Sequence, residues 1–339
     1  MGKLGLISGL FFCMCIATSV KGNDPYFTQF FNSPLNLNPA YTGTANGSLR
    51  LNLNYRNYLY ALSSYETYSF AIDMPLFENK WKGDFVGLGL IVNNDVSGAS
   101  VIRLNALLSM AYHKAIGQNG NHFLSFGFQG GIIQNDANFS GLSTQSQWVP
   151  GVGYDPSLGN GENFSMEKVL VPDLNVGLLW YMFIGDRSML YLGISAAHLT
   201  EPNISVFEGT DTKLNRKYLG HLGSYIGLNA KMGMIPAVVF TQQNNLNSYN
   251  YGVNFEYDLS QAKQEILLTF GPWMRNLDAV IIYGGVLWKK LHFGISYDLA
   301  ISELNTAKGN GGVEFSISYN LKKKSIKMPK LMSNPNPQM

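Results

Sequence analysis

The side chains best suited to acid–base or metal chemistry are few in this chain of 339 residues. Two cysteines, Cys13 and Cys15, lie near its start, and no two of its five histidines have the His-x-x-x-His spacing of a metal motif. His198 is the only histidine with a plausible acid–base partner nearby in sequence, either Glu201 or Asp211. A histidine that lines a lumen or a rim is the better interpretation. We therefore expect no catalytic residue, no metal and no cofactor.

Two glycine-rich stretches, 151–155 and 159–162, hold the remaining candidate ligands. They could hold a cation, but loops of this composition usually only turn. Neither has the strand–turn–helix context of a phosphate-binding loop. The chain has 24 basic and 22 acidic residues, and loss of Lys3 and Lys21 with a leader peptide would leave 22 of each (24 − 2). A charge balance near zero gives no electrostatic reason to expect a nucleic acid partner.

Any functional site must be positioned by the segments that make up most of the chain. In these segments apolar and polar residues alternate, which is the two-residue period of a β-strand. The first is Leu49-Arg50-Leu51-Asn52-Leu53-Asn54-Tyr55-Arg56, with one apolar face and one face of asparagine and arginine. Polar side chains at every second position would be costly to bury in a dry core. A barrel with lipid outside and a water-filled lumen inside removes that cost.

About fourteen segments of this kind follow one another. They cover 48–58, 64–74, 84–94, 99–114, 121–134, 172–182, 188–200, 216–230, 233–243, 247–258, 264–274, 278–288, 290–299 and 311–321. Each is near the 9–11 residues that cross a bilayer at a tilt, or somewhat longer, and single-chain bacterial barrels have an even number of strands. We expect the five tryptophans in the barrel wall or at its interfaces.

Composition supports a membrane barrel. Charged residues make up 14% of the chain and aromatic residues 13%, whereas an ordinary soluble domain has about 25% charged residues. No apolar run long enough for a spanning helix follows the N-terminus. The fold class that we predict is an all-β, antiparallel transmembrane β-barrel of about fourteen strands in the cell outer membrane.

The lengths of the connections predict the orientation of this barrel. The three long connections, 135–171, 201–215 and 300–310, are the fifth, seventh and thirteenth. They therefore emerge on the same side, while the short connections emerge on the other. Outer-membrane barrels have long extracellular loops and short periplasmic turns, so we expect the chain to enter the first strand from the periplasm.

Both termini differ from the barrel in composition. Residues 1–22 resemble a secretory signal peptide, with Lys3 before a mostly apolar run and cleavage near Gly22. We expect 23–47 to form an N-terminal periplasmic or lumen segment, and 48–321 to form the barrel. The basic residues 322–339, which include Asn334-Pro335-Asn336-Pro337, are expected to be a disordered tail.

The stretch from Asp24 to Gly43 is aromatic and rich in asparagine and proline, with no strand or helix period. Its prolines oppose a regular helix, and its aromatic side chains need a surface to pack against. We expect an irregular segment at or in the periplasmic mouth that narrows the lumen. The alternative is a well-packed cap with no role in partner binding.

This stretch resembles the start of the PorP/SprF family of outer-membrane proteins, which has the form D-P-x-F-[ST]-Q-[FY]…N…[LI]-N-P-A-[YF]-x-G. The residues that match, and that the resemblance makes candidate lumen or partner contacts, are Asp24, Pro25, Phe27, Gln29, Phe30, Asn32, Asn38, Pro39, Ala40, Tyr41 and Gly43.

The resemblance implies a non-enzymatic component of the type IX secretion and gliding machinery that supports secretion, anchoring or surface display of cargo such as adhesins. It implies periplasmic ring and motor components and a secreted surface protein as partners, beside the lipid bilayer and lipopolysaccharide. The residues alone leave open a passive porin or uptake channel for a small solute. An enzyme built in a barrel is disfavoured by the few acid–base groups.

Overall fold

The computed structural model describes residues 24, 26–45, 47–59, 64–81, 83–98, 101–117, 121–137, 145–155, 157–158, 168–185, 187–206, 210–261, 265–276, 279–301 and 311–321. The expected signal peptide, 1–22, and the expected tail, 322–339, lie outside these residues. No helix in this part of the chain is long and apolar enough to cross a membrane.

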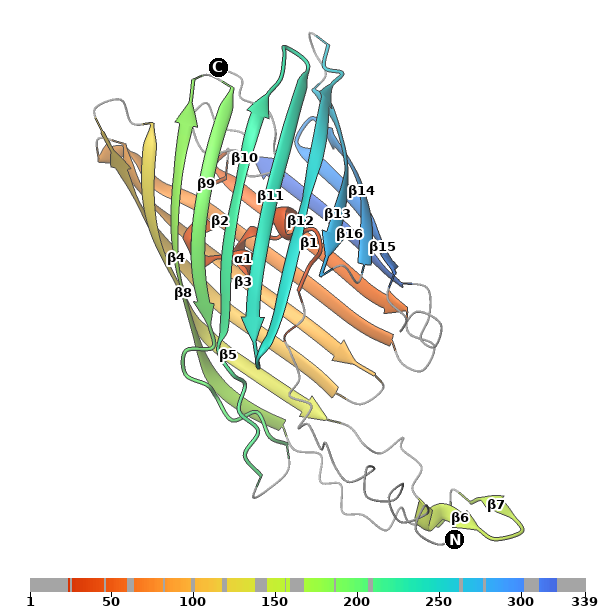
Figure 1. Cartoon of the computed structure of the whole chain (residues 1–339). Helices are drawn as coiled ribbons and strands as arrows, with labels where there is room; N and C mark the ends of the chain where they lie inside the picture. The colour runs from red at the N-terminus through yellow and green to blue at the C-terminus, as the bar shows by residue number, and fades with distance from the viewer. Residues whose placement is uncertain are drawn as a thin grey trace, which may run out of the picture.

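Fourteen antiparallel strands form a closed barrel, as predicted (Figure 1). Its strands are β1 (Leu49–Leu59), β2 (Ser64–Trp81), β3 (Asp84–Ser97), β4 (Val101–Ile116), β5 (His122–Ala137), β8 (Lys168–Ile184), β9 (Ser188–Ala197), β10 (Lys217–Gly227), β11 (Met232–Gln243), β12 (Leu246–Asp258), β13 (Ile266–Arg275), β14 (Ala279–Trp288), β15 (Leu291–Ala300) and β16 (Gly311–Leu321). Pairing of β1 with β16, from Leu49↔Leu321 to Leu59↔Gly311, closes the sheet. Closure removes the unpaired edges that a membrane does not tolerate.

Each expected segment coincides with one of these strands, and the largest differences are extensions. The strand β2 continues to Trp81 because it remains paired with β3, through a register shift between Leu76 and Trp81. The strand β8 begins at Lys168, opposite Asp136 of β5. Between them, the short 3-10 helix η3 (Gln145–Gln147) precedes a separate two-stranded ribbon of β6 (Trp148–Val149) and β7 (Gly153–Tyr154).

The two ends of the barrel differ in their connections. The long connections, 138–167, 198–216 and 301–310, all lie at the end where β1 finishes. We call this the loop end, at the bottom of Figure 1. The opposite end, where β1 begins and β16 finishes, is the turn end. The parity prediction is therefore confirmed: the three long connections share one end of the barrel.

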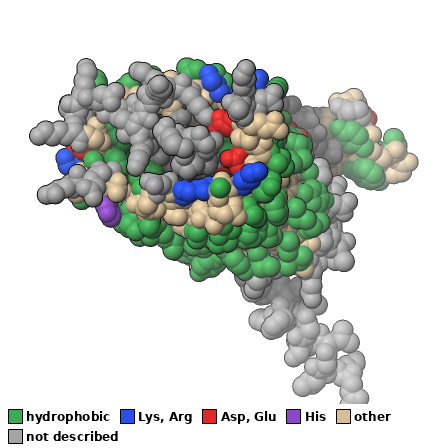
Figure 2. Space-filling model, turned by 90° about the horizontal axis from the view of Figure 1, so that it is seen from above, with side chains coloured by type: hydrophobic (Ala, Val, Ile, Leu, Met, Phe, Trp, Pro, Cys, Tyr) green, Lys and Arg blue, Asp and Glu red, His purple; other side chains and the backbone are tan. Residues whose placement is uncertain are grey.

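Alternate side chains face opposite sides of the wall. In β4, Leu107 faces the lumen with 2% of its surface exposed, whereas Leu108 faces outward with 65% exposed. Viewed from the turn end, the outer wall is covered by hydrophobic side chains, and charged side chains gather at the rim (Figure 2). This outward apolar face is the face that lipid covers in a membrane barrel.

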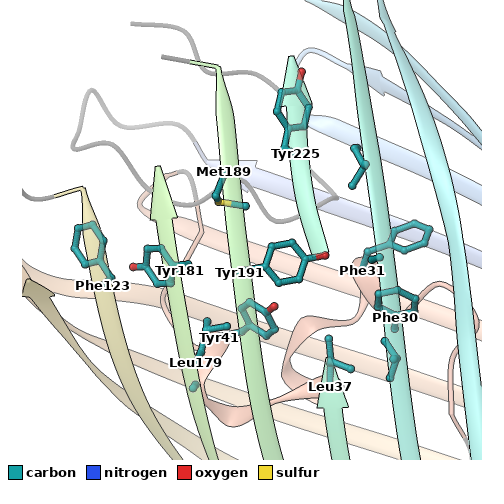
Figure 3. Close-up of a cluster of buried hydrophobic side chains, with 14 of the residues drawn as sticks. Phe30, Phe31, Leu37, Tyr41, Phe123, Leu179, Tyr181, Met189, Tyr191 and Tyr225 are labelled. Carbon is teal, nitrogen blue, oxygen red and sulfur yellow. The ribbon is translucent and has the colours of Figure 1, made fainter. Parts of the chain in front are cut away.

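The lumen differs from the water-filled channel that the polar pattern suggested. Its largest hydrophobic cluster combines wall residues such as Phe123, Tyr181 and Tyr191 with Phe30 and Tyr41 of the N-terminal segment (Figure 3). Trp273 stands in the wall, on β13, as expected, and its side chain belongs to this cluster. Much of the polar lumen surface is likewise buried against protein. The polar faces of the strands therefore have protein partners inside the barrel.

Candidate functional site

The N-terminal segment lies inside the barrel. We call residue 24 and residues 26–45 the lumen segment. Three short helices shape it: η1 (Phe30–Asn32), α1 (Pro34–Leu37) and η2 (Pro39–Tyr41). Two of these begin at a proline, whose fixed φ suits the first helical position and whose missing N–H has no helical partner there. Each helix has at most four residues, so tertiary contacts must hold the segment in place.

The lumen segment runs the length of the barrel, further than the periplasmic mouth where it was expected. Asp24 contacts Lys217, the first residue of β10, at the loop end. Near the end of the segment, the carboxylate of Asp73 accepts a hydrogen bond from the backbone N–H of Gly43. The chain then enters β1 at the turn end, where the backbone N–H of Ser48 donates to the carbonyl of Leu321. The chain therefore crosses the lumen once before it builds the wall.

Every barrel strand contacts the lumen segment. The contacts, taken in strand order from β1 to β16, come from Asn52, Asp73, Asn93, Ser109, Gln129, the Leu178 carbonyl, Ser195, His221, Gln243, Asn250, Trp273, Tyr283, Asp298 and Glu314. In strand order, β1 and β10 are diametrically opposed. The segment therefore bridges the full width of the lumen.

A buried cluster of charges holds the first part of the segment. The two carboxylate oxygens of Glu314 accept the backbone N–H groups of Thr28 and Gln29, at 2.7 and 2.9 Å. Asp298 accepts from the Thr28 hydroxyl at 3.1 Å and pairs with Arg56 at 2.7 Å. Hydrogen bonds to charged groups are the stronger kind, and here they fix backbone atoms rather than mobile side chains.

Gln29 and Asn32 extend this cluster toward the middle of the barrel. The side-chain amide of Gln29 donates to Ser296 at 3.0 Å and to the Glu314 carbonyl at 2.9 Å. Asn32 donates to the oxygen of Gln29 and to the hydroxyl of Ser316, both at 2.9 Å. An amide can donate and accept at once, so these two family-motif residues connect the segment to β15 and β16.

The Asn38-Pro39-Ala40 motif is placed against glycines of the wall. The Asn38 amide donates to the carbonyls of Leu178 and Ile194, at 2.9 and 3.1 Å, and its oxygen accepts the Ala40 N–H at 2.9 Å. A Cβ on Gly127 would lie under 3.0 Å from the backbone of Pro39 and Ala40, and one on Gly177 would meet the Asn38 side chain. The glycines therefore make room for the backbone of the motif.

The final turn of the segment rests on a buried ion pair. Asp73 binds the Gly43 N–H at 2.7 Å and pairs with Arg50 at 2.8 Å, and Arg50 also donates to the Tyr41 carbonyl at 3.2 Å. Gly43 has φ +81°, a left-handed conformation that suits glycine. A Cβ on Gly87 of β3 would meet the Thr42 carbonyl.

Aromatic side chains fill the space between the polar clusters (Figure 3). Phe30 meets Trp273 edge to face at 5.3 Å between ring centroids, and Phe31 meets Tyr283 in the same way at 4.9 Å. Tyr41 stacks on His221 at 5.3 Å. Edge-to-face contacts add to the free energy of burial, so these rings help to anchor the segment.

Asp24 binds three basic side chains at the loop end: His198, Lys217 and Arg103. Burial alone would raise the pKa of the Asp24 carboxyl, but Lys217, His198 and Arg103 together hold it well below its usual value. Burial alone would lower the pKa of His198, but Asp24 and Asp173 raise it to about 9. These shifts favour a charged Asp24 and a protonated His198 near neutral pH.

The acid–base pair considered from the sequence does not form. Glu201 pairs with Arg216 and Asp211 with Lys213, whereas His198 lies between the carboxylates of Asp24 and Asp173. A histidine held protonated by two carboxylates is a poor general base.

The structure brings most of the expected motif residues together as contacts between segment and wall. The exception is Pro25, which lies outside the described residues; Phe27 is buried beside a lumen cavity. The wall partners Asp73, Asp298 and Glu314 were visible only as polar positions in alternating strands. Their pairing with residues up to 286 positions away in sequence leaves no local signal.

Solved structures confirm the architecture. The deltaS2S3 and deltaS2 mutants of the TodX monoaromatic hydrocarbon channel, a toluene transporter of Pseudomonas putida, each share 12% identity with this chain at a TM-score of 0.51. Both alignments cover 85% of this chain, with 94% and 93% of those chains. The toluene transporter TbuX of Ralstonia pickettii has 11% identity, coverage of 85% and 92%, and a TM-score of 0.49. At this identity the likeness shows the fold alone.

Sequence comparison identifies the family. No curated protein matches this chain, but residues 19–319 match the family described as type IX secretion system membrane protein PorP/SprF. That range includes the described lumen segment and all but the end of β16. The chain therefore belongs to the PorP/SprF family of type IX secretion system membrane proteins, and it is an integral β-barrel of the outer membrane.

Proposed function

We propose that this protein is a non-enzymatic outer-membrane component that supports secretion, anchoring or surface display of type IX cargo such as adhesins. The observation that carries the proposal is the lumen segment, which makes contacts with all fourteen strands and spans the width of the barrel. A passive porin needs a water-filled lumen. Here the lumen groups that would line such a channel bind the protein's own N-terminal segment.

We propose further that the turn end faces the periplasm, because outer-membrane barrels have short periplasmic turns. The end of β16 would then lie on the periplasmic side, toward ring and motor components, and the loop end of the barrel would face the cell surface and its cargo. The outward apolar face would contact lipid and lipopolysaccharide. These partners follow from family membership, and their identities are part of the proposal.

The alternative function is a passive channel for a small solute, and conductance separates the two. The intact protein in a planar bilayer should show little steady conductance, whereas a variant lacking residues 24–43 should show a large one. A large steady conductance from the intact protein would favour the channel.

Secretion provides the second half of the test. A host strain lacking this protein should fail to display a type IX cargo, and the intact chain should restore display and recover secretion proteins in a pull-down from native membranes. The variant lacking 24–43 should assemble as a barrel, shown by the gel shift of the folded form, but restore display poorly. Normal display in the strain that lacks the protein would overturn the proposal.

A further inference from the structure

Three cationic side chains of the wall converge on the carboxylate of Asp24 at the loop end. Its Oδ1 lies 3.3 Å from Nη1 of Arg103 on β4. Its Oδ2 lies 3.3 Å from Nζ of Lys217, the first residue of β10, and contacts Nε2 of His198, which directly follows β9. We call Arg103, His198 and Lys217 the cationic cradle. A carboxylate is the group that such a set of donors binds best.

The wall holds His198 in position without help from the lumen segment. Its Nδ1 lies 2.9 Å from a carboxylate oxygen of Asp173, and its backbone N–H donates to the side-chain oxygen of Asn175 at 3.0 Å. Both partners belong to β8. The Nε2 atom is therefore a preorganised donor, and preorganisation lowers the cost of binding a ligand.

The charges around the cradle leave a place for one negative charge. Besides Asp24, the acidic groups that face it are Asp173, which binds His198, and Asp95 of β3, which interacts with Arg103. With His198 protonated, three positive and two negative charges give a net charge of +1 (3 − 2) when Asp24 is left out. An uncompensated buried charge is costly, and one monovalent carboxylate removes that cost.

The cradle is accessible to solvent. The side chains of Arg103 and Lys217 are 18% and 13% exposed. Both also line a cavity of about 120 Å³, together with Tyr26, which is 37% exposed. A small ligand can therefore reach the two cations that hold Asp24.

Asp24 can leave the cradle while the other anchors of the lumen segment stay in place. Its carboxylate and its backbone N–H, which donates to Gln243 at 2.9 Å, are its contacts with the wall. The next anchors, the Tyr26 carbonyl and the Thr28 N–H, bind Arg56 of β1 and Glu314 of β16. Because Asp24 is tethered, it has a high effective concentration at the cradle, and a free carboxylate must compete with it.

We propose that the cationic cradle is a carboxylate-binding site that Asp24 occupies as an internal ligand, and that a small monovalent carboxylate entering from the loop end takes its place. The entering carboxylate binds the same three side chains, and the first residues of the lumen segment leave the cradle. This site is separate from the proposed secretion role, and it does not depend on which side of the membrane the loop end faces.

Binding of trifluoroacetate to the full chain in detergent micelles, followed by ¹⁹F NMR, tests this proposal. Asp24→Ala removes the internal ligand. We expect this variant to bind trifluoroacetate at least ~10-fold more tightly than the wild type, because the tethered carboxylate no longer competes. Neutral trifluoroacetamide should show no saturable binding to either protein. Equal affinity of the two proteins for trifluoroacetate, or no saturable binding to Asp24→Ala beyond that of empty micelles, would overturn the proposal.

A matched pair of lysine substitutions locates the binding. In the Asp24→Ala protein, Lys217→Met removes one charge from the cradle. Lys213→Met removes an equal charge from a side chain that is 59% exposed and pairs with Asp211. The first should weaken trifluoroacetate binding by roughly 10-fold or more, because truncating one partner of a close charge pair is costly, and the second should leave it unchanged. Equal affinity in the two double variants would contradict the assignment.

Hydrogen exchange in the wild type decides the matter if Asp24→Ala fails to assemble. Ligand binding and release of Asp24 are linked, so a ligand that displaces Asp24 must free its backbone N–H from Gln243. At half-saturation, sodium trifluoroacetate should accelerate exchange at Asp24 at least ~2-fold relative to sodium chloride at the same ionic strength, while peptides from the barrel wall keep their protection. Equal exchange at Asp24 in the two salts would refute the displacement.

Discussion

Gly127 of β5 offers a direct test of how the lumen segment is held. Substitution by alanine adds a single methyl group on the lumen side of the wall. That methyl would lie under 3.0 Å from the backbone of Pro39 and Ala40. Backbone atoms cannot rotate away as the end of a flexible side chain can, so the Asn38-Pro39-Ala40 motif must move.

The magnitude follows from the cost of overpacking, which is typically about 1–3 kcal/mol. If the barrel holds its shape, this cost falls on the docking of the segment. Each 1.4 kcal/mol is about a tenfold change in an equilibrium constant. The population with an undocked segment should therefore rise roughly 5- to 150-fold in Gly127→Ala.

Hydrogen exchange read by mass spectrometry measures this population. The backbone N–H groups of Ala40, Tyr41 and Thr42 donate to Asn38 and Pro39 inside the lumen, and their exchange requires local opening. Their exchange should accelerate by the same factor, while peptides from the barrel wall keep their protection.

Gly284→Ala is the matched control, because a Cβ there would meet nothing within 4 Å. It should leave exchange in the segment at the wild-type rate. Identical exchange over residues 38–42 in the two alanine variants would refute the argument that wall glycines are required for docking of the motif.

Three further perturbations address other parts of the segment. Because the pKa of His198 is raised, the stabilisation that protonated His198 gives to the docked segment is fully present below its unfolded pKa of about 6.5 and is lost as the pH rises through about 9. Hydrogen exchange near Asp24, corrected for intrinsic rates, should therefore rise over this pH window in the wild type and stay flat in His198→Gln. A flat wild-type profile would contradict this prediction. Asn38→Ala removes the two hydrogen bonds that the Asn38 amide donates to the carbonyls of Leu178 and Ile194, and it should weaken docking by about 1–3 kcal/mol. The loss would appear as faster exchange over residues 38–42, and unchanged exchange there would contradict it. Arg50→Met leaves Asp73 as an unpaired buried charge, so it should lower the free energy of unfolding of the barrel in urea by about 3–5 kcal/mol. Adding Asp73→Asn should recover most of this free energy. An equal loss in the double variant would show that the unpaired charge is not the cause.

The strands could be predicted from the sequence because their signal is local. Lipid and lumen impose opposite demands on successive side chains, so alternation repeats in each strand and needs no knowledge of the partner strand. The same holds for the position of the long connections, which depends only on counting strands. Extensions such as Pro75–Trp81 were missed because backbone pairing continues there after the side-chain alternation ends.

The lumen segment could be recognised from the sequence, but its position could not. Its prolines and aromatic residues showed that it needed a surface, and the family motif showed which residues matter. Only the closed barrel places Glu314 against Thr28 and Gln29, or Gly127 against Ala40. These contacts join the segment to residues of distant strands, so they exist only in the closed barrel. The sequence by itself thus determined the barrel and the importance of its first residues, and the tertiary structure decided that those residues fill the lumen.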